Sequence, residues 1–159
     1  MSEQRATGEV RLSIEVAVPL DHAFRVFTEQ FDSIKPREHN LLAVDIAETV
    51  LEAKPGGRVY DQGIDGSICE WARVIEVEPP HRLVLAWLIS PQWQVEERKD
   101  RASQVEVRFS AIDDRNTRVE LRHHGLERHG AGWESAASSL SGEAGWPLYL
   151  KSFQQLLAA

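Results

Sequence analysis

The sequence contains little sulfur, with Cys69 as its single cysteine and one methionine in 159 residues. One thiol cannot form a disulfide within the chain, and a chain without disulfides suits a reducing compartment. The first nine residues contain no apolar segment of the kind that a secretory signal requires. Together these two absences predict a cytoplasmic location.

The sequence also lacks long apolar runs and any excess of basic residues. Its longest apolar run, residues 83–89, is far shorter than the roughly 20 residues that a membrane-spanning helix needs. Lysine and arginine number 18 against 25 aspartates and glutamates, which gives a net charge of −7. A negative protein repels phosphate backbones and anionic membrane surfaces. We therefore expect neither nucleic acid nor a membrane as a partner.

The remaining composition is that of an ordinary globular protein. Hydrophobic residues make up 42% of the chain and charged residues 27%, without repeats or low-complexity segments. A chain of this length can bury a substantial core. We predict a single domain over residues 1–159, with residues 1–8 as a flexible tail.

Alternating apolar and polar residues predict several strands. The alternation is clearest over 10–18, 68–77, 103–110 and 117–124, and shorter or less regular over 41–51 and 58–62. Residues 83–89 are apolar on both faces, which is typical of a central strand. Turn signals such as Asp65-Gly66 separate neighbouring strands. Hairpins in succession predict an antiparallel sheet.

Three segments show helical spacing instead. In 145–159, Trp146, Tyr149, Leu150 and Phe153 recur at i, i+3, i+4 and i+7, and this pattern predicts an amphipathic helix. Two shorter helices are expected after residue 19 and over 133–140. Since a short helix is marginal by itself in water, the last one must pack its apolar face on the sheet. The predicted fold class is α+β, with the helices on one face of the sheet.

Three stretches of the sequence also resemble a known family. They are 56–87, reading GGRVYDQGIDGSICEWARVIEVEPPHRLVLAW, then 117–134, TRVELRHHGLERHGAGWE, and the terminal GWP at 145–147. They are similar to the START-like, or SRPBCC, polyketide-cyclase superfamily, in the branch of heat shock protein 90 ATPase activator homologues. One departure is Ala72, where relatives carry glycine.

The resemblance implies a helix-grip fold, in which a curved antiparallel sheet wraps around a long C-terminal helix with two shorter helices. It also implies a cavity between sheet and helix. Members of the superfamily bind lipids, hormones or polyketides, and some cyclise them.

Arg73 is the basic residue with the clearest functional alternative. Alternation places it on the same strand face as Trp71 and Ile75. If that face is the inner one, the guanidinium would anchor an acidic ligand, or it would form a structural ion pair with a carboxylate such as Asp61. The sequence favours the ion pair, because arginines are mostly exposed or paired.

Among the histidines, His123 is the candidate for ligand binding or acid–base chemistry. It is in phase with Val119 and Leu121, so we expect it to face inward. There it would donate to a ligand or act as a general acid or base, or it would simply hydrogen-bond within the core. The histidine spacing matches no zinc pattern, so neither a metal nor a cofactor is predicted.

Aromatic residues supply the remaining candidates for the cavity wall. With Arg73 and His123, the predicted ligand-binding set is Tyr60, Trp71, Trp87, Phe109, Trp146, Tyr149 and Phe153. Such residues line apolar ligand pockets, but they also fill ordinary cores. Whether their volumes leave a void is not contained in the sequence.

Three functions remain open at this point. The first is a module that binds a small apolar or amphipathic molecule without chemistry, for which no catalytic residue is assigned. The second is a cyclase or aromatase in which His123, Arg73 or Tyr60 polarises a carbonyl. The third is a co-chaperone-like interaction domain that stimulates a heat shock protein 90 ATPase. An exposed patch around Leu88 would in addition favour a homodimer.

Overall fold

A single curled antiparallel sheet forms the larger layer of the protein. The computed structural model describes residues 9–158, so the tail predicted at residues 1–8 lies outside the described residues. The strand order across the sheet is β1-β7-β6-β5-β4-β3-β2. The strands are β1 (Val10–Val16), β2 (Ile46–Leu51), β3 (Arg58–Gly63), β4 (Ile68–Glu78), β5 (Arg82–Trp87), β6 (Ser103–Asp113) and β7 (Asn116–His124).

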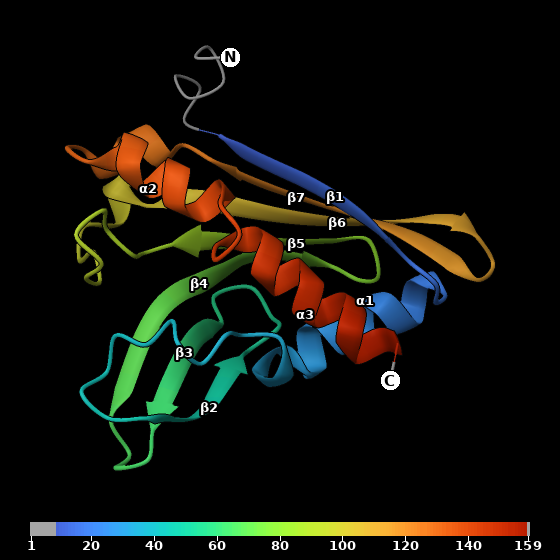
Figure 1. Ribbon diagram of the computed structural model, residues 1–159, viewed down its shortest axis with the longest axis horizontal. Helices are drawn as coiled ribbons and strands as arrows, with labels where there is room; N and C mark the ends of the chain where they lie inside the picture. Colours follow the sequence, from blue (N-terminus) through green and yellow to red (C-terminus); the bar gives the residue numbers. More distant parts are fainter. Residues whose placement is uncertain (1–8, 159) are drawn as a thin grey trace.

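Helices cover the concave face of this sheet (Figure 1). They are α1 (Leu20–Glu29), α2 (Trp133–Ser141) and α3 (Trp146–Ala158), with short 3-10 turns η2 (Phe31–Ser33), η3 (Lys99–Arg101) and η4 (Leu126–His129). α2 and α3 follow one another across the sheet, and α1 packs beside α3. The predicted α+β helix-grip fold is thereby confirmed. Within residues 9–158, no helix has the length and apolar character needed to cross a membrane.

The apolar face of α3 forms the centre of the core, as its spacing predicted. Its buried residues are Trp146, Tyr149, Leu150 and Phe153. The Phe153 side chain is fully buried, and its ring stands edge-on to Phe27 of α1 at 5.2 Å between centroids. Phe27 in turn meets Phe109 of β6 edge-on at 5.7 Å. One aromatic cluster therefore joins both helices to the sheet.

Residues 142–145 separate α2 from α3 and require a glycine at one position. A Cβ atom on Gly145 would lie 2.2 Å from the backbone oxygen of Leu140, which is far too close for any side chain. Gly145 is therefore needed for this close approach of two backbone segments. The approach fixes where α3 begins above the sheet.

Two bulges in β4 change the inward and outward alternation that the sequence predicted. The partners of β4 on β3 skip Trp71, and its partners on β5 skip Ile75. Each skipped residue reverses the alternation of those that follow. Val74 is consequently buried, whereas Ile75 is 38% exposed and Arg73 lies on the outer face opposite Arg58. The expectation that Arg73 faces inward was wrong.

The structure also corrects the predicted start of the second strand and the predicted exposure of Leu88. The strand predicted over 41–51 begins only at Ile46, because Asn40 organises the preceding loop through hydrogen bonds with Val44 and Leu42, both 2.8 Å long. Leu88 is only 8% exposed, so it forms no exposed patch. A homodimer remains a prediction without that argument.

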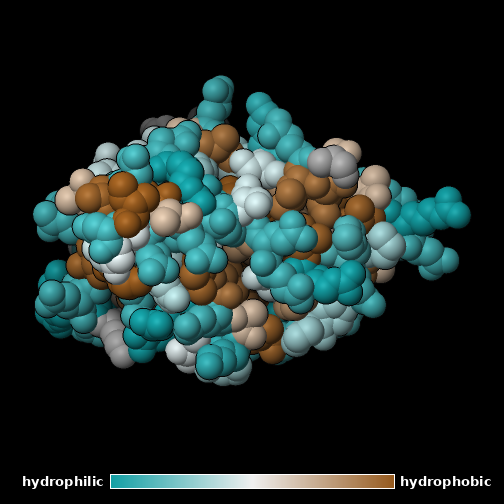
Figure 2. Space-filling view, turned by 90° about the horizontal axis from the view of Figure 1, so that it is seen from below, coloured by the Kyte–Doolittle hydropathy of each residue, from teal (hydrophilic) through white to brown (hydrophobic). Residues whose placement is uncertain are grey.

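Large apolar side chains that do reach the surface are scattered, with one grouping. Figure 2 shows apolar patches separated by hydrophilic residues. Among the exposed residues, Leu41 and Trp93 line a pocket between the sheet, the segment 35–41 and the junction of α2 with α3. Val95, also exposed, pairs with Ile89, which lines this pocket too. Exposed apolar surface therefore gathers at the mouth of that pocket, as is common at binding sites.

Candidate functional site

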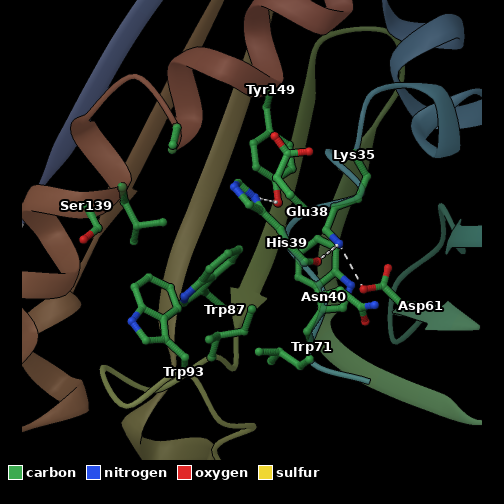
Figure 3. A pocket seen from close by; sticks show the side chains of 15 residues that line it. Lys35, Glu38, His39, Asn40, Asp61, Trp71, Trp87, Trp93, Ser139 and Tyr149 are labelled. Atoms are coloured by element: carbon green, nitrogen blue, oxygen red, sulfur yellow. Dashed lines mark hydrogen bonds and ion pairs between the residues drawn. The ribbon is translucent and has the colours of Figure 1, made fainter. Parts of the chain in front are cut away.

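A pocket of about 370 Å³ opens between the sheet, the segment 35–41 and the junction of α2 with α3. The loop that follows β5 contributes Ile89 and Trp93 to its wall. Figure 3 shows its lining, with Lys35 and Asp61 on one side and Trp93 and Ser139 on the other. A volume of this size lies within the range of about 300–1,000 Å³ usual for small-molecule pockets.

Aromatic side chains make up much of the wall. Trp71 and Trp87 meet edge-on, with ring centroids 5.5 Å apart, and Tyr149 contributes a third buried ring from α3. Trp93 is 46% exposed and has a left-handed backbone with φ of 61°. A bulky residue rarely adopts that conformation, and such backbone strain often occurs at functional sites. Trp93 is the aromatic residue of the wall that faces solvent.

A buried ion pair forms the polar side of the pocket. Lys35 Nζ lies 2.9 Å from Asp61 Oδ2, and each side chain is 3% exposed. The ammonium also donates to the carbonyl of His39 at 2.7 Å, while Asp61 Oδ1 accepts from the Thr49 hydroxyl at 2.7 Å. Burial lowers the pKa of Lys35, and the charge of Asp61 opposes that change.

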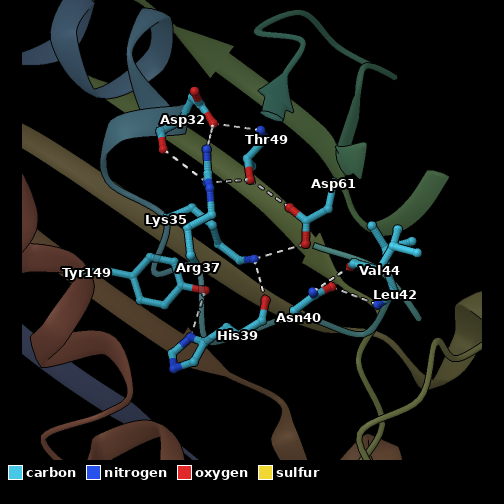
Figure 4. A network of polar contacts seen from close by, with 10 residues as sticks. All are labelled: Asp32, Lys35, Arg37, His39, Asn40, Leu42, Val44, Thr49, Asp61 and Tyr149. Atoms are coloured by element: carbon cyan, nitrogen blue, oxygen red, sulfur yellow. Dashed lines mark hydrogen bonds and ion pairs between the residues drawn. The ribbon is translucent and has the colours of Figure 1, made fainter. Parts of the chain in front are cut away.

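Further hydrogen bonds hold this pair in place from two neighbouring elements. Asp32 of η2 accepts from the backbone N–H of Thr49 on β2 at 2.7 Å, and it also pairs with Arg37 (Figure 4). Arg37 lies 3.5 Å from the Thr49 hydroxyl. The polar side of the pocket is therefore a connected network, which restricts the positions that Lys35 and Asp61 can adopt.

Tyr149 and His39 lie next to the ion pair. The Tyr149 hydroxyl is 3.4 Å from His39 Nδ1. Burial raises the pKa of Tyr149, and the carboxylates of Asp61 and Glu38 add to that rise. Burial lowers the pKa of His39, and the positive charge of Lys35 lowers it further. At neutral pH the pocket therefore presents a neutral phenol and a neutral imidazole.

His123 belongs to a second polar cluster, beneath the wall of the pocket. Trp146 Nε1–H donates to His123 Nδ1 at 3.0 Å, so His123 Nε2 carries the proton and donates to Ser103 Oγ at 2.7 Å. The Ser103 hydroxyl is then the donor to His129 Nε2, at 2.8 Å. His123 and Ser103 are both fully buried. The cluster joins α3 to β6, β7 and η4.

This cluster predicts a loss of stability in mild acid. Burial lowers the pKa of His123 to about 3, with smaller effects from the charges of His129 and His124. Below about pH 6.5 the His123 imidazole binds a proton in the unfolded chain but stays neutral in the folded protein. The free energy of unfolding therefore falls by up to ~1.4 kcal/mol per pH unit. We expect a loss of about 2–3 kcal/mol from this group between pH 6.5 and 4.5, measured by urea unfolding.

The matched variant for this measurement is His123→Gln, whose amide can accept from Trp146 and donate to Ser103. Burial also lowers the pKa of His129, so a shallower pH dependence of the same sign should remain in the variant. Equal pH slopes for wild type and His123→Gln would show that His123 is not the group that titrates.

The structure divides the predicted ligand-binding residues into three groups. Trp71, Trp87 and Tyr149 line the pocket. Trp146 and His123 lie behind the wall, where both rings contact Trp87. The others are elsewhere: Phe109 and Phe153 are in the aromatic core, Tyr60 lies under the Arg58 guanidinium at 4.6 Å, and Arg73 pairs with Glu70 on the outer face. Asp61 pairs with Lys35 and not with Arg73.

Among the pocket residues that the sequence interpretation missed are Lys35, His39, Asp61 and Trp93. Asp61 carried a usable signal, because it alternates in phase with Val59 and a carboxylate on an inner face needs a cationic partner. Lys35 and His39 carried none, since the segment that follows η2 has no periodic pattern.

Comparisons with known proteins agree with this architecture. A solved structure of an anthrahydroquino-gamma-pyrone synthase in complex with a ligand is 38% identical, covering 93% of this chain and 96% of that one at a TM-score of 0.65. The self-sacrificing resistance protein CalC from Micromonospora echinospora is 25% identical, covering 95% and 94% at a TM-score of 0.65. Protein NE0264 from Nitrosomonas europaea, 18% identical over 96% of each chain with a TM-score of 0.66, shares the fold.

No curated protein matches the chain. The sequence model of one family, described as "Activator of Hsp90 ATPase homolog 1-like protein", matches residues 17–158. That match spans almost the whole described chain, from the end of β1 to the end of α3. The chain therefore belongs to the family of activator of Hsp90 ATPase homolog 1-like proteins.

Proposed function

We propose that the protein binds a flat, fused-ring aromatic molecule of the polyketide type in this pocket. The observation that carries the proposal is the composition of the wall, in which Trp71, Trp87 and Tyr149 surround about 370 Å³ while the charged groups gather on one side. Flat rings favour stacked or edge-on contact with such side chains. A mostly apolar wall with a few grouped polar atoms is typical of small-molecule sites.

The relatives support the aromatic character of the ligand. The synthase that is 38% identical is named for an anthrahydroquino-gamma-pyrone, a fused-ring product. Its similarity extends over 93% of this chain. Apolar and amphipathic ligands in general remain compatible with the family, and the wall favours the aromatic ones.

Calorimetric titration with two tricyclic probes, xanthone and xanthene, tests this proposal. We expect saturable binding with a dissociation constant on the order of 10 µM, as is reasonable for about 15 heavy atoms. Ala144→Trp places a large side chain at an exposed position of the pocket lining and should weaken binding at least tenfold.

The matched control is Ala111→Trp, which adds the same side chain at an exposed position of β6 away from the pocket. Its affinity for both probes should equal that of the wild type. Absence of binding to wild type, or equal weakening by both variants, would contradict the proposed site.

A second candidate is a cyclase that closes a pyrone ring, because the 38% identical relative is a synthase. Lys35, His39 and Tyr149 are groups in the pocket that can donate or accept protons. The test substrate is an ortho-hydroxyaryl 1,3-diketone. In its ring closure the phenol oxygen forms a bond to the ketone carbon and one water leaves. Faster closure with wild type than with Ala144→Trp would favour the enzyme over a binding protein.

The co-chaperone role stays a prediction from the sequence resemblance. The pocket, on which the present proposal rests, gives no reason to prefer it.

A further inference from the structure

Trp71 has a polar atom that its surroundings leave without a partner. Its side chain is 1% exposed and lines the pocket, yet its Nε1–H is buried and has no hydrogen-bond partner among the described residues. Buried polar atoms are nearly always hydrogen-bonded, because leaving one without a partner is costly. An orphan donor in a pocket wall points to an acceptor that arrives with the ligand.

Lys35 supplies a second donor close to the first. Its Nζ lies 5.3 Å from the centroid of the Trp71 ring. An ammonium has three N–H groups, and among the described residues only Asp61 and the His39 carbonyl accept from it. One N–H group of Lys35 thus has no oxygen acceptor among the described residues, and the ammonium itself lies over the face of the Trp71 ring, on the same side of the pocket (Figure 3).

The charges around these donors determine what kind of acceptor fits. The pocket lining contains one ammonium, Lys35, and two carboxylates, Asp61 and Glu38. Asp61 already neutralises Lys35 at 2.9 Å. A ligand carboxylate would therefore add a negative charge to a lining that is already negative on balance. A neutral oxygen acceptor meets the same donors without that cost.

We infer that Trp71 Nε1 and Lys35 Nζ together form a subsite for a neutral carbonyl oxygen, such as a ring ketone, quinone or pyrone carbonyl. The inference rests on the proposed function, because it assigns an orientation to the same aromatic ligand. The ring system lies along Trp87 toward Trp93, and its carbonyl points to the side of Lys35 and Asp61. The subsite selects ketones over hydrocarbons and over acids of the same shape.

Three matched tricyclic ligands test the subsite on wild-type protein. Xanthone carries a ring carbonyl, xanthene has a methylene in its place, and xanthene-9-carboxylate carries an anion at that position. We expect xanthone to bind about tenfold more tightly than xanthene in calorimetric titration, and the carboxylate to bind more weakly than xanthene. Tenfold corresponds to about 1.4 kcal/mol. Equal affinities for xanthone and xanthene, or tightest binding of the carboxylate, would overturn the inference.

Trp71→Phe then removes the indole donor and keeps an aromatic ring in the wall. Its preference for xanthone over xanthene should fall clearly below tenfold, because only the Lys35 donor remains, while the xanthene affinity changes by less than about threefold, well under the 1.4 kcal/mol of a tenfold change. Trp87→Phe is the control, and should change both affinities by the same factor. A Trp71→Phe protein that retains the tenfold preference for xanthone would exclude Trp71 as the donor.

The failure of the inference is distinguishable from that of the proposed function. If neither xanthone nor xanthene binds to the wild type, the proposed function itself fails. If both bind with the same affinity, the pocket binds aromatic ligands and only the carbonyl subsite is wrong. Thermal unfolding of each variant checks its fold. If Trp71→Phe does not fold, the affinities of the three ligands for the wild type still decide whether the pocket has a carbonyl subsite.

Discussion

Lys35→Met is expected to lower the free energy of unfolding by about 3–5 kcal/mol, because it leaves the Asp61 carboxylate buried without its cation. Both side chains are 3% exposed, so water does not readily replace the lost partner. The variant also removes the donor to the His39 carbonyl. Chemical unfolding at neutral pH, compared with wild type, measures the loss.

The double variant Lys35→Met/Asp61→Asn separates loss of the pair from loss of the lysine. The asparagine amide at position 61 still accepts from the Thr49 hydroxyl and carries no charge. We therefore expect the double variant to regain more than half of the stability that Lys35→Met loses. Lys151→Met, at an exposed position of α3, controls for the substitution and should change stability by less than about 0.5 kcal/mol. Additive effects of Lys35→Met and Asp61→Asn would show that the two charges are not coupled.

Phe153→Ala is expected to cost about 3–5 kcal/mol of stability by opening a cavity in the centre of the core. Phe153 is fully buried and its ring meets Phe27 of α1 edge-on at 5.2 Å. Removal of the Phe153 ring therefore weakens the packing of α3 against α1 as well as against the sheet. Urea unfolding is again the measurement.

Gln155→Ala on the exposed side of α3 is the matched control and should leave stability within about 0.5 kcal/mol of wild type. A loss below 1 kcal/mol for Phe153→Ala would mean that α3 is peripheral and that the core lies elsewhere.

The sequence alone determined the fold class and most of its elements. Alternation and helical spacing are local properties, set by which side of a strand or helix must be buried, so they predicted β1, β6, β7 and α3 with small errors at their ends. The inward position of His123 followed from the same alternation, and it is confirmed by complete burial. The tertiary structure added its partners, Trp146 and Ser103, which come from other elements.

Only the tertiary structure decided which side chains form the pocket. A bulge at Trp71 moved Arg73 to the outer face, and the alternation of one strand does not show where its pairing with the next strand skips a residue. Lys35 and Asp61 are 26 positions apart and meet because η2 packs on β2, the strand next to β3 in the sheet. Their pairing depends on the distance between elements in space, and the sequence of either element by itself does not contain that distance.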